Sequence, residues 1–392
     1  CARTRPGDVK QYLFTALVTA VLTFVLAGAV WRLALRFKLY PAIRERDVHT
    51  RPTPRLGGIA MFLGIVVAFG FTAQNDFFHR VWIDPQPVLA ILAATVLIVA
   101  VGIADDLWDL DWMIKLAAQV GAAAIIAWFG GIQIYSLPVG GLTVGSSWMS
   151  VVLTILSIVV VMNAVNFIDG LDGLVAGVAL IANGVFFAWS YLLVRDTGQS
   201  TYSNLASLIA VVLVGACVGF LPWNWSPAKM FMGDSGALML GLLMATSGIA
   251  VTGQLNPATL DPETLGRSQL LGAFIPVLLP VAVVILPLLD FGLAVIRRTG
   301  AGRSPFSPDR KHLHHRLLDL GHSDRSAVLI FYAWAAIVGL AVLLMYIATR
   351  ENWPGQYWIG VGFGVLGGAA CVIVTALPSR RRRPDPRAKD PA

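Results

Sequence analysis

Three short segments of this 392-residue chain combine residue types that suit the binding of a divalent cation and of phosphate. The first is the adjacent pair Asp105 and Asp106, followed nine residues later by Lys115, which is the one cation of its loop. The second runs over 163–173 and the third over 231–236. Adjacent carboxylates repel one another, so a cation is expected to offset their charge. Opposite such a pair, a lysine could either snorkel as an interface anchor or hold a phosphate.

The second segment reads Asn163-Ala-Val-Asn166-Phe-Ile-Asp169-Gly-Leu-Asp172-Gly173. A helix would bring Asn163 and Asn166 onto one face, because they are three residues apart. The glycines allow a tight turn and the close approach of a ligand. Asp172 precedes the next apolar run, so capping of a helix is an equally good interpretation of that residue.

The third segment, Phe231-Met-Gly-Asp234-Ser-Gly236, also precedes an apolar run. As a metal ligand, Asp234 would offer the hard oxygen that Mg²⁺ prefers. Alternatively, Asp234 or Ser235 caps a helix and has no further role. In company with the other two segments, the metal site is the favoured interpretation.

A histidine-rich segment follows later in the chain, at 303–316. It places three imidazoles among cations within seven residues, which predicts an anion-binding surface; the residues are Arg310, His312, His314 and His315. Such a tract can also bind zinc, but soft ligands are absent, so phosphate is the favoured partner. Asp290 lies inside an apolar run, where an acid is either functional or paired with a cation such as Arg297.

The composition shows which kind of chain must position these residues. Hydrophobic residues make up 57% and charged residues 13%, and the mean hydropathy is +0.73. Ordinary soluble domains are roughly 45–50% apolar and about 25% charged, so this chain has too little polar surface for water. The composition excludes a soluble enzyme, a disordered chain and a disulfide scaffold. The net charge of +7 sits beside the apolar runs, which indicates membrane topology rather than nucleic-acid binding.

Apolar runs long enough to cross a bilayer recur along the whole chain, and lipid forces each of them to be helical. They predict an all-α polytopic membrane protein with eleven transmembrane helices, near 11–35, 56–73, 87–104, 114–130, 150–168, 173–194, 204–222, 235–252, 270–296, 326–348 and 357–377. Residues 1–378 are expected to form a single transmembrane domain. Residues 379–392, with four consecutive arginines, are expected to form a basic disordered tail.

The distribution of Lys and Arg predicts the orientation. One set of loops carries 21 of these residues and the opposite set carries 7, so the first set is expected to be cytoplasmic. The N-terminus is then outside and the C-terminus inside. All of the acids named above except Asp290, and the three clustered histidines, fall on the cytoplasmic side. A solvated surface could carry scattered acids, but it does not explain why they gather where spans reach the interface.

Five motifs in order resemble the polyprenyl-phosphate N-acetylhexosamine-1-phosphate transferase family, from about Tyr40 to His315. They are His49-Thr-Arg-Pro-Thr-Pro-Arg-Leu-Gly-Gly58, the aspartate pair with Lys115, the segment 163–173, the segment 231–236, and His312-Leu-His-His315. Five ordered motifs are far more specific than any one of them. The resemblance implies a transferase in a bacterial plasma membrane with its active site facing the cytoplasm.

The interrupted histidine run resembles the WecA-like branch, which uses UDP-N-acetylglucosamine. The branch that uses UDP-muramoyl pentapeptide has three consecutive histidines, and Leu313 interrupts that run here. The acceptor is expected to be undecaprenyl or decaprenyl phosphate. Abundant alanine and arginine with few lysines suggest an actinobacterium, for which the resemblance implies decaprenyl phosphate. Another UDP-N-acetylhexosamine or UDP-muramoyl pentapeptide stays open as the donor, and so does a homodimer as the assembly.

Asp105, Asp106 and Asp169 are expected at the catalytic centre, Lys115 on the lipid phosphate, and Asn166 and Asp234 on Mg²⁺, with Mn²⁺ as an alternative. The nucleotide sugar is expected to meet Asn163, Asp172, Arg310, His312, His314 and His315. A secondary transporter is the rival from a different class, since Asn163, Asn166 and Asp290 could line a pathway. A transporter places polar groups near the bilayer midplane, whereas here they crowd one interface.

Overall fold

The computed structural model of the chain describes residues 8–40, 53–135, 146–197, 201–252, 317–351, 353–355 and 357–376, and a few single positions between 285 and 302. Every secondary-structure element in these ranges is a helix, which confirms the predicted all-α class. The elements are α1 (Asp8–Arg36), α2 (Gly57–Ala73), η1 (Asp76–Phe78), α3 (His79–Trp82), α4 (Gln86–Trp108), α5 (Trp112–Ala124), η2 (Ile125–Phe129), α6 (Ser147–Phe167), α7 (Leu174–Thr197), α8 (Thr201–Asn224), α9 (Gly233–Thr252), α12 (Asp324–Arg350) and α13 (Tyr357–Ala376).

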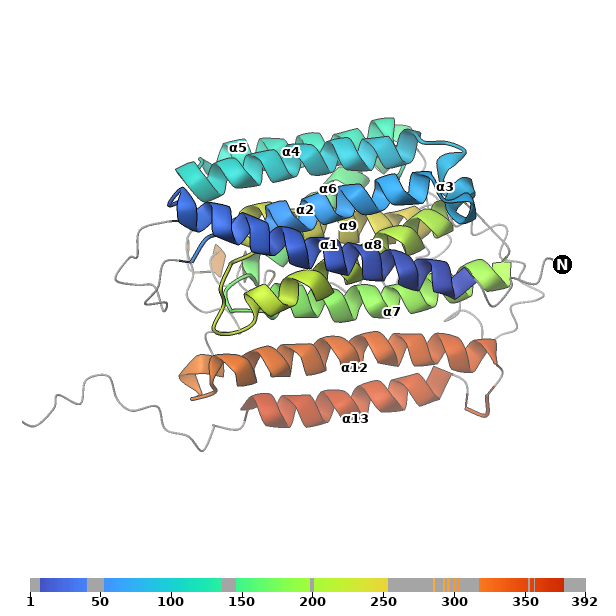
Figure 1. The fold of residues 1–392 in the computed structure, drawn as a ribbon. Helices are drawn as coiled ribbons and strands as arrows, with labels where there is room; N and C mark the ends of the chain where they lie inside the picture. The colour runs from blue at the N-terminus through green and yellow to red at the C-terminus, as the bar shows by residue number, and fades with distance from the viewer. Residues whose placement is uncertain are drawn as a thin grey trace, which may run out of the picture.

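The long helices run side by side along a common axis (Figure 1). Among the described residues, nine helices are long and apolar enough to cross a membrane, or ten if α2 and its bent continuation 76–82 count as one span. These helices coincide with ten of the eleven predicted spans. The remaining one, 270–296, lies outside the described residues except for isolated positions. The chain is therefore a polytopic membrane protein.

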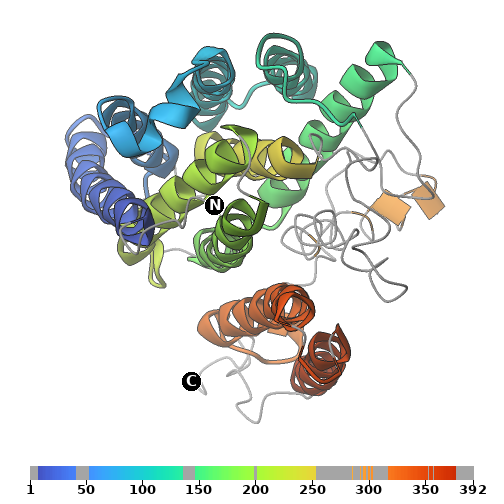
Figure 2. The ribbon, with the colours of Figure 1, turned by 90° about the vertical axis from the view of Figure 1, so that its right-hand side faces the viewer.

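Helix α9 lies at the centre of the bundle (Figure 2). Of its membrane-length window, 94% is buried, compared with 11% for the peripheral α13. Helices α2, α4, α6 and α8 pack around α9. Its N-terminal turn, which carries Asp234, is thus surrounded by protein rather than by lipid.

Helix α1 packs closely against α8 because α8 presents two glycines one turn apart. A Cβ atom at Gly215 would lie 2.4 Å from the carbonyl oxygen of Ala16, and one at Gly219 would lie 2.2 Å from that of Ala20. Small residues at this spacing let membrane helices approach backbone to backbone.

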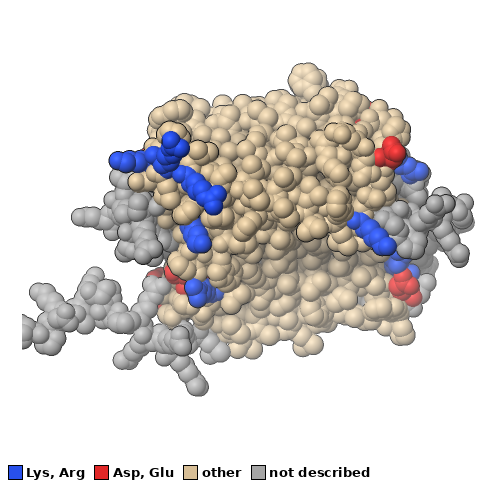
Figure 3. All heavy atoms as spheres, in the orientation of Figure 1, with Lys and Arg blue, Asp and Glu red and all other residues tan. Residues whose placement is uncertain are grey.

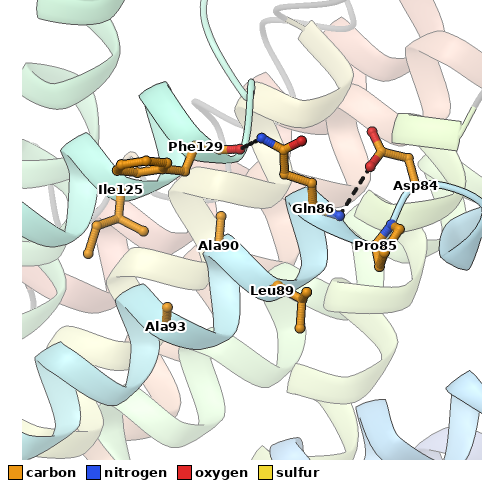
Figure 4. Close-up of a pocket in the computed structure, with 8 residues that line it drawn as sticks. All are labelled: Asp84, Pro85, Gln86, Leu89, Ala90, Ala93, Ile125 and Phe129. Atoms are coloured by element: carbon orange, nitrogen blue, oxygen red, sulfur yellow. Dashed lines mark hydrogen bonds between the residues drawn. The ribbon is translucent and has the colours of Figure 1, made fainter.

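A shallow groove opens at the start of α4, between that helix and the π-helical turn η2 (Figure 4). The Gln86 side chain closes one end by donating a hydrogen bond of 2.8 Å to the carbonyl oxygen of Phe129. The floor is apolar and includes Leu89 and Ala93. At about 1.5 Å per helical residue, the α4 residues that line the groove, Gln86 to Ala93, lie roughly 18–28 Å from Asp105, so the groove belongs to the opposite end of the bundle.

Candidate active site

Asp105 and Lys115 form an ion pair across the tight connection between α4 and α5. Lys115 Nζ lies 3.0 Å from Asp105 Oδ2, while Asp105 Oδ1 accepts a hydrogen bond of 2.8 Å from the backbone of Leu110. Asp111 begins α5 by accepting a hydrogen bond from the backbone of Met113 at 2.8 Å. The turn therefore brings Lys115 back over the carboxylate that precedes it in the sequence.

Asp106 has a different partner, because its carboxylate caps the N-terminus of α9. Asp106 Oδ1 accepts a hydrogen bond of 3.1 Å from the backbone N–H of Asp234. Asp106 Oδ2 accepts two more from Ser235, at 3.3 Å from the backbone and 3.1 Å from the hydroxyl. The first N–H groups of a helix lack partners within it, and the positive end of the helix dipole favours a carboxylate there. The cap on α9 therefore comes from Asp106 on α4. The alternative interpretation expected it from the side chain of Asp234 or Ser235.

The Asp234 carboxylate faces two polar side chains from other helices. Its Oδ2 lies 3.6 Å from Lys115 Nζ and 3.4 Å from Asn166 Nδ2. The Asp234 side chain keeps 28% of its surface exposed, whereas Asp105 keeps 8%. Helices α4, α5, α6 and α9 therefore bring four of the predicted site residues, Asp105, Lys115, Asn166 and Asp234, to one place.

Glycines allow the backbone of α9 to come this close to its neighbours. A Cβ atom at Gly58 would lie 2.3 Å from the backbone nitrogen of Gly236, and one at Gly102 would lie 2.4 Å from Cα of Ser235. Gly233 itself has φ +73°, a conformation that other residues rarely adopt. The start of α9 is therefore held in a cradle made by α2 and α4.

The segment before α2 pairs with the segment before α9, although more than 170 residues separate them in the sequence. Phe231 donates a backbone hydrogen bond of 2.8 Å to Pro54, and Gly57 and Gly58 donate bonds of 3.0 and 2.9 Å to Phe231 and Met232. This pairing brings residues 53–58 of the first predicted motif against the Gly-Asp-Ser-Gly motif.

Asp169 and Asp172 lie in the turn between α6 and α7. Asp172 Oδ2 accepts a hydrogen bond of 3.0 Å from the backbone of Ala228, in the loop between α8 and α9. The pKa of Asp169 is raised to about 7, chiefly by burial and also by the charges of Asp234 and Asp172, while the charge of Arg55 acts to lower it. Near neutral pH this carboxyl therefore titrates, and a nearby cation would shift it toward the ionised form.

Asn163 joins α6 to α5. Its Nδ2 donates to Gln119 Oε1 at 2.5 Å and to the carbonyl oxygen of Val159 at 2.8 Å. Gln119 was not among the predicted site residues. A signal for it was available, since Gln119 follows Lys115 by four residues and so shares its helix face.

Several predicted residues lie outside the part of the chain that the structure describes. They are His49, Asp290, Arg297, Arg310, His312, His314 and His315.

The side chains that the structure brings together suit a magnesium ion. Among the described residues, no group of three His, Cys, Asp or Glu side chains could enclose a metal. Mg²⁺ needs no such cage, because it keeps several waters and takes one or two carboxylates together with substrate phosphates. Asp234 supplies a carboxylate oxygen, and rotation of the Asn166 amide by 180° would present its oxygen on the same side. The donor set therefore fits.

The described residues therefore form a bundle of membrane-length helices with carboxylates gathered around one lysine at one end, an arrangement suited to binding phosphate and a cation. The sequence pattern of the family described as Glycosyl transferase family 4 matches residues 88–252, the stretch that carries all of the described site acids. The decaprenyl-phosphate N-acetylglucosaminephosphotransferase of Mycolicibacterium smegmatis is 38% identical over 96% of this chain and 91% of its own length.

The protein of the same description from Mycobacterium tuberculosis strain H37Rv is 42% identical, with the same coverage of both chains. The undecaprenyl-phosphate alpha-N-acetylglucosaminyl 1-phosphate transferase of Escherichia coli strain K12 is 28% identical over 80% of this chain and 78% of its own. The chain therefore belongs to glycosyl transferase family 4, which confirms the resemblance drawn from its five motifs.

Proposed function

We propose that this enzyme transfers N-acetylglucosamine 1-phosphate from UDP-N-acetylglucosamine to decaprenyl phosphate and releases UMP. One observation carries the proposal. In a family 4 chain, the Asp105–Lys115 pair and the Asp234–Asn166 pair share one end of the bundle, with Lys115 Nζ 3.0 Å from Asp105 and 3.6 Å from Asp234. The names of the mycobacterial relatives support decaprenyl phosphate as the acceptor.

The reaction is a displacement at phosphorus. An oxygen of the lipid phosphate attacks the phosphorus attached to the sugar, and the bond from that phosphorus to the UMP oxygen breaks. The acceptor phosphate is already partly dianionic near neutral pH, because the second pKa of a phosphate monoester is about 6. The protein therefore needs chiefly to align the anions and to offset their charge.

Lys115 serves the acceptor in this proposal. Its ammonium group has three donors, of which one is used by Asp105 at 3.0 Å and one points toward Asp234 at 3.6 Å. The third can hold an oxygen of the lipid phosphate. Asp105 then orients Lys115, while Asp106 holds the α9 N-terminus and thereby Asp234.

Asp234 and Asn166 would hold the Mg²⁺ ion, with Mn²⁺ as a substitute. When bound, the ion would supply positive charge to the diphosphate of the donor. Asp169 and Asp172 would serve the nucleotide end together with Asn163. Arg310, His312, His314 and His315 would bind the phosphates and the sugar.

The test of the function is UMP release by the purified full-length protein. It is incubated with decaprenyl phosphate, Mg²⁺ and a panel of UDP-sugars, and both UMP and the lipid-linked product are measured. We expect UDP-N-acetylglucosamine to be the best donor. Release of UMP with another UDP-N-acetylhexosamine or with UDP-muramoyl pentapeptide as the best donor would contradict the sugar, and absence of UMP with every donor would contradict the reaction.

Lys115→Ala is expected to raise the apparent KM for the lipid about 10- to 150-fold, with the KM for the UDP-sugar near the wild-type value. The reason is that the variant loses a charge-assisted contact to the acceptor phosphate, worth about 1.5–3 kcal/mol. Steady-state kinetics with each substrate varied in turn measure both values. The matched control is Lys38→Ala, an exposed lysine just beyond α1, which should leave both unchanged. A raised KM for the sugar nucleotide with a normal KM for the lipid would reverse the assignment.

We propose further that the site faces the cytoplasm across a bacterial plasma membrane. Lys and Arg side chains lie at both ends of the bundle in Figure 3, with more of them at the end where α1 ends, which is the end that carries the site. A reporter fused after Pro378 is expected to show the activity typical of the cytoplasm. Activity typical of the outside at that position would overturn both the orientation and the placing of the site.

A further inference from the structure

The backbone of Gly173, at the end of the turn that carries Asp169 and Asp172, is held through both its N–H and its carbonyl oxygen by side chains of other helices. Its N–H donates a hydrogen bond of 3.0 Å to Asn224 Oδ1 on α8. Its carbonyl oxygen accepts one of 2.5 Å from the hydroxyl of Tyr332 on α12. Gly173 has φ +79°, so the turn depends on a backbone conformation that other residues rarely adopt.

The approach of Tyr332 depends on a second glycine. A Cβ atom at Gly177, one turn into α7, would lie 1.9 Å from the Tyr332 hydroxyl oxygen and 1.9 Å from Cζ of its ring. The ring of Trp225 lies on another side, with centroids 6.3 Å apart. The phenol is therefore seated in a slot that a single methyl group on α7 would fill.

Helix α12 also holds the loop that binds Asp172. Arg325, in the first turn of α12, donates from Nε and Nη2 to the carbonyl oxygen of Ser226 at 3.1 and 2.8 Å. Two residues later in that loop, the backbone of Ala228 donates to Asp172 at 3.0 Å. The start of α12 thus fixes both the turn that carries Asp172 and the loop that this carboxylate binds.

We propose that Tyr332 is a positioning residue for the sugar nucleotide, acting through the Gly173 carbonyl on the turn that carries Asp169 and Asp172. This inference rests on the proposed assignment of those two aspartates to the donor. Tyr332 holds the carbonyl of the peptide that follows Gly173, and Asn224 holds the N–H of the peptide between Asp172 and Gly173. Together they fix the backbone on both sides of Gly173, and with it the position of Asp172. In the described part of the chain, α12 packs mainly against α7 and α13, whereas α4 and α5 build the lipid side of the site, so the effect should be confined to the donor.

The first experiment is Tyr332→Phe, which removes the hydroxyl and keeps the ring in its slot. We expect the KM for UDP-N-acetylglucosamine to rise about three- to tenfold, the effect of losing one hydrogen bond, with the KM for the lipid unchanged. Tyr346→Phe, on the same helix roughly four turns away, should leave both values unchanged. A purely structural role would lower the yield of folded enzyme and leave both KM values as they are, and that result would overturn the proposal.

The second experiment is a double-mutant cycle between Gly177 and Tyr332. Gly177→Ala should push the phenol away from Gly173 and raise the KM for the donor as Tyr332→Phe does. In a Tyr332→Ala background the ring is gone, so Gly177→Ala should add nothing. Gly184→Ala on the same helix, where a Cβ atom would meet nothing within 4 Å, is the matched control. Additive effects of the two changes on the KM for the donor would refute the contact as the cause.

A third variant separates this inference from the function on which it rests. Asp172→Asn is measured beside Tyr332→Phe, both by kinetics and by direct calorimetric binding of UDP. If Asp172→Asn weakens donor binding and Tyr332→Phe does not, the positioning role alone is wrong. If Asp172→Asn leaves donor binding unchanged, the donor assignment is wrong and the role of Tyr332 falls with it.

Discussion

Asp234→Asn is expected to reduce turnover about 100-fold or more while the protein still folds and inserts. Loss of groups that merely support a metal ligand typically costs about 10–100-fold, so loss of the ligand itself should cost at least the upper value. The substitution keeps the shape of the side chain and its contact with Asn166, but it removes the negative charge from a position 3.6 Å from Lys115. The expected result is an intact bundle without its proposed magnesium ligand.

The geometry separates this interpretation from helix capping. Losing a cap costs about 0.5–2 kcal/mol of stability and need not affect turnover. The cap of α9 comes from Asp106, whose carboxylate lies 3.1 Å from the Asp234 backbone nitrogen, so the Asp234 side chain is not needed for it. Asp84→Asn is the matched control, because Asp84 accepts a hydrogen bond of 3.1 Å from Gln86 at the start of α4. That variant should keep the wild-type rate.

The measurement has a second readout besides activity. A ligand that binds only the native state raises the melting temperature, and more so the more tightly it binds, so Mg²⁺ should stabilise the wild type and Asp84→Asn. It should not stabilise Asp234→Asn. A variant that turns over at the wild-type rate, with unchanged dependence on Mg²⁺, would show that Asp234 does not hold the metal.

Gly102→Ala is the second large effect, with a loss of both stability and activity. The added Cβ atom would lie 2.4 Å from Cα and 2.5 Å from the backbone nitrogen of Ser235, and a helix backbone cannot rotate away as a side chain can. Helix α4 must therefore move away from α9 just before Asp105 and Asp106. Overpacking of this kind costs about 1–3 kcal/mol, and a displaced aspartate pair should lower turnover more than tenfold.

The predicted loss of stability is opposite in sign to the usual effect of replacing glycine by alanine in a helix. In a helix, Gly→Ala ordinarily stabilises by up to about 1 kcal/mol, because alanine has less backbone entropy to lose. Gly121→Ala on α5, with its nearest neighbour 3.7 Å away, and Gly70→Ala on α2, with nothing within 4 Å, should be neutral or slightly stabilised. Melting temperature and UMP release are compared across the three variants. A Gly102→Ala enzyme with the melting temperature and rate of these controls would show that the cradle does not hold α9.

Both predictions test the same structural arrangement at the start of α9. Asp106 and the glycines hold the first turn of α9, and that turn holds Asp234 beside Lys115 and Asn166. These described polar groups lie at one end of the bundle, where a soluble donor and a lipid headgroup can meet. A transport pathway would require such groups near the bilayer midplane, so the arrangement favours the transferase over the transporter.

Much of the fold follows from the sequence, because the physics of a bilayer is simple. A backbone without water must bond to itself, so every apolar run of sufficient length becomes a helix. For the same reason the sequence showed that the acids after 87–104 and after 150–168 lie in turns at the ends of membrane spans. The clustered carboxylates and cations, together with the preference of Mg²⁺ for oxygen ligands, then indicated phosphate chemistry. Five motifs in order indicated the family.

The contacts between different helices could not be predicted from the sequence. Local spacing identifies neighbours only on one helix, as with Lys115 and Gln119 four residues apart. The cap that Asp106 places on α9, the bond from Asn163 to Gln119, and the bond from Tyr332 to Gly173 join residues 44 to 159 positions apart. Such pairs depend on how closely and at what angle the helices cross. Here glycine at positions 58, 102 and 177 allows the close approach, because no side chain stands in the way. Which neighbouring atoms come to lie against each glycine is decided only by the packing of the whole bundle.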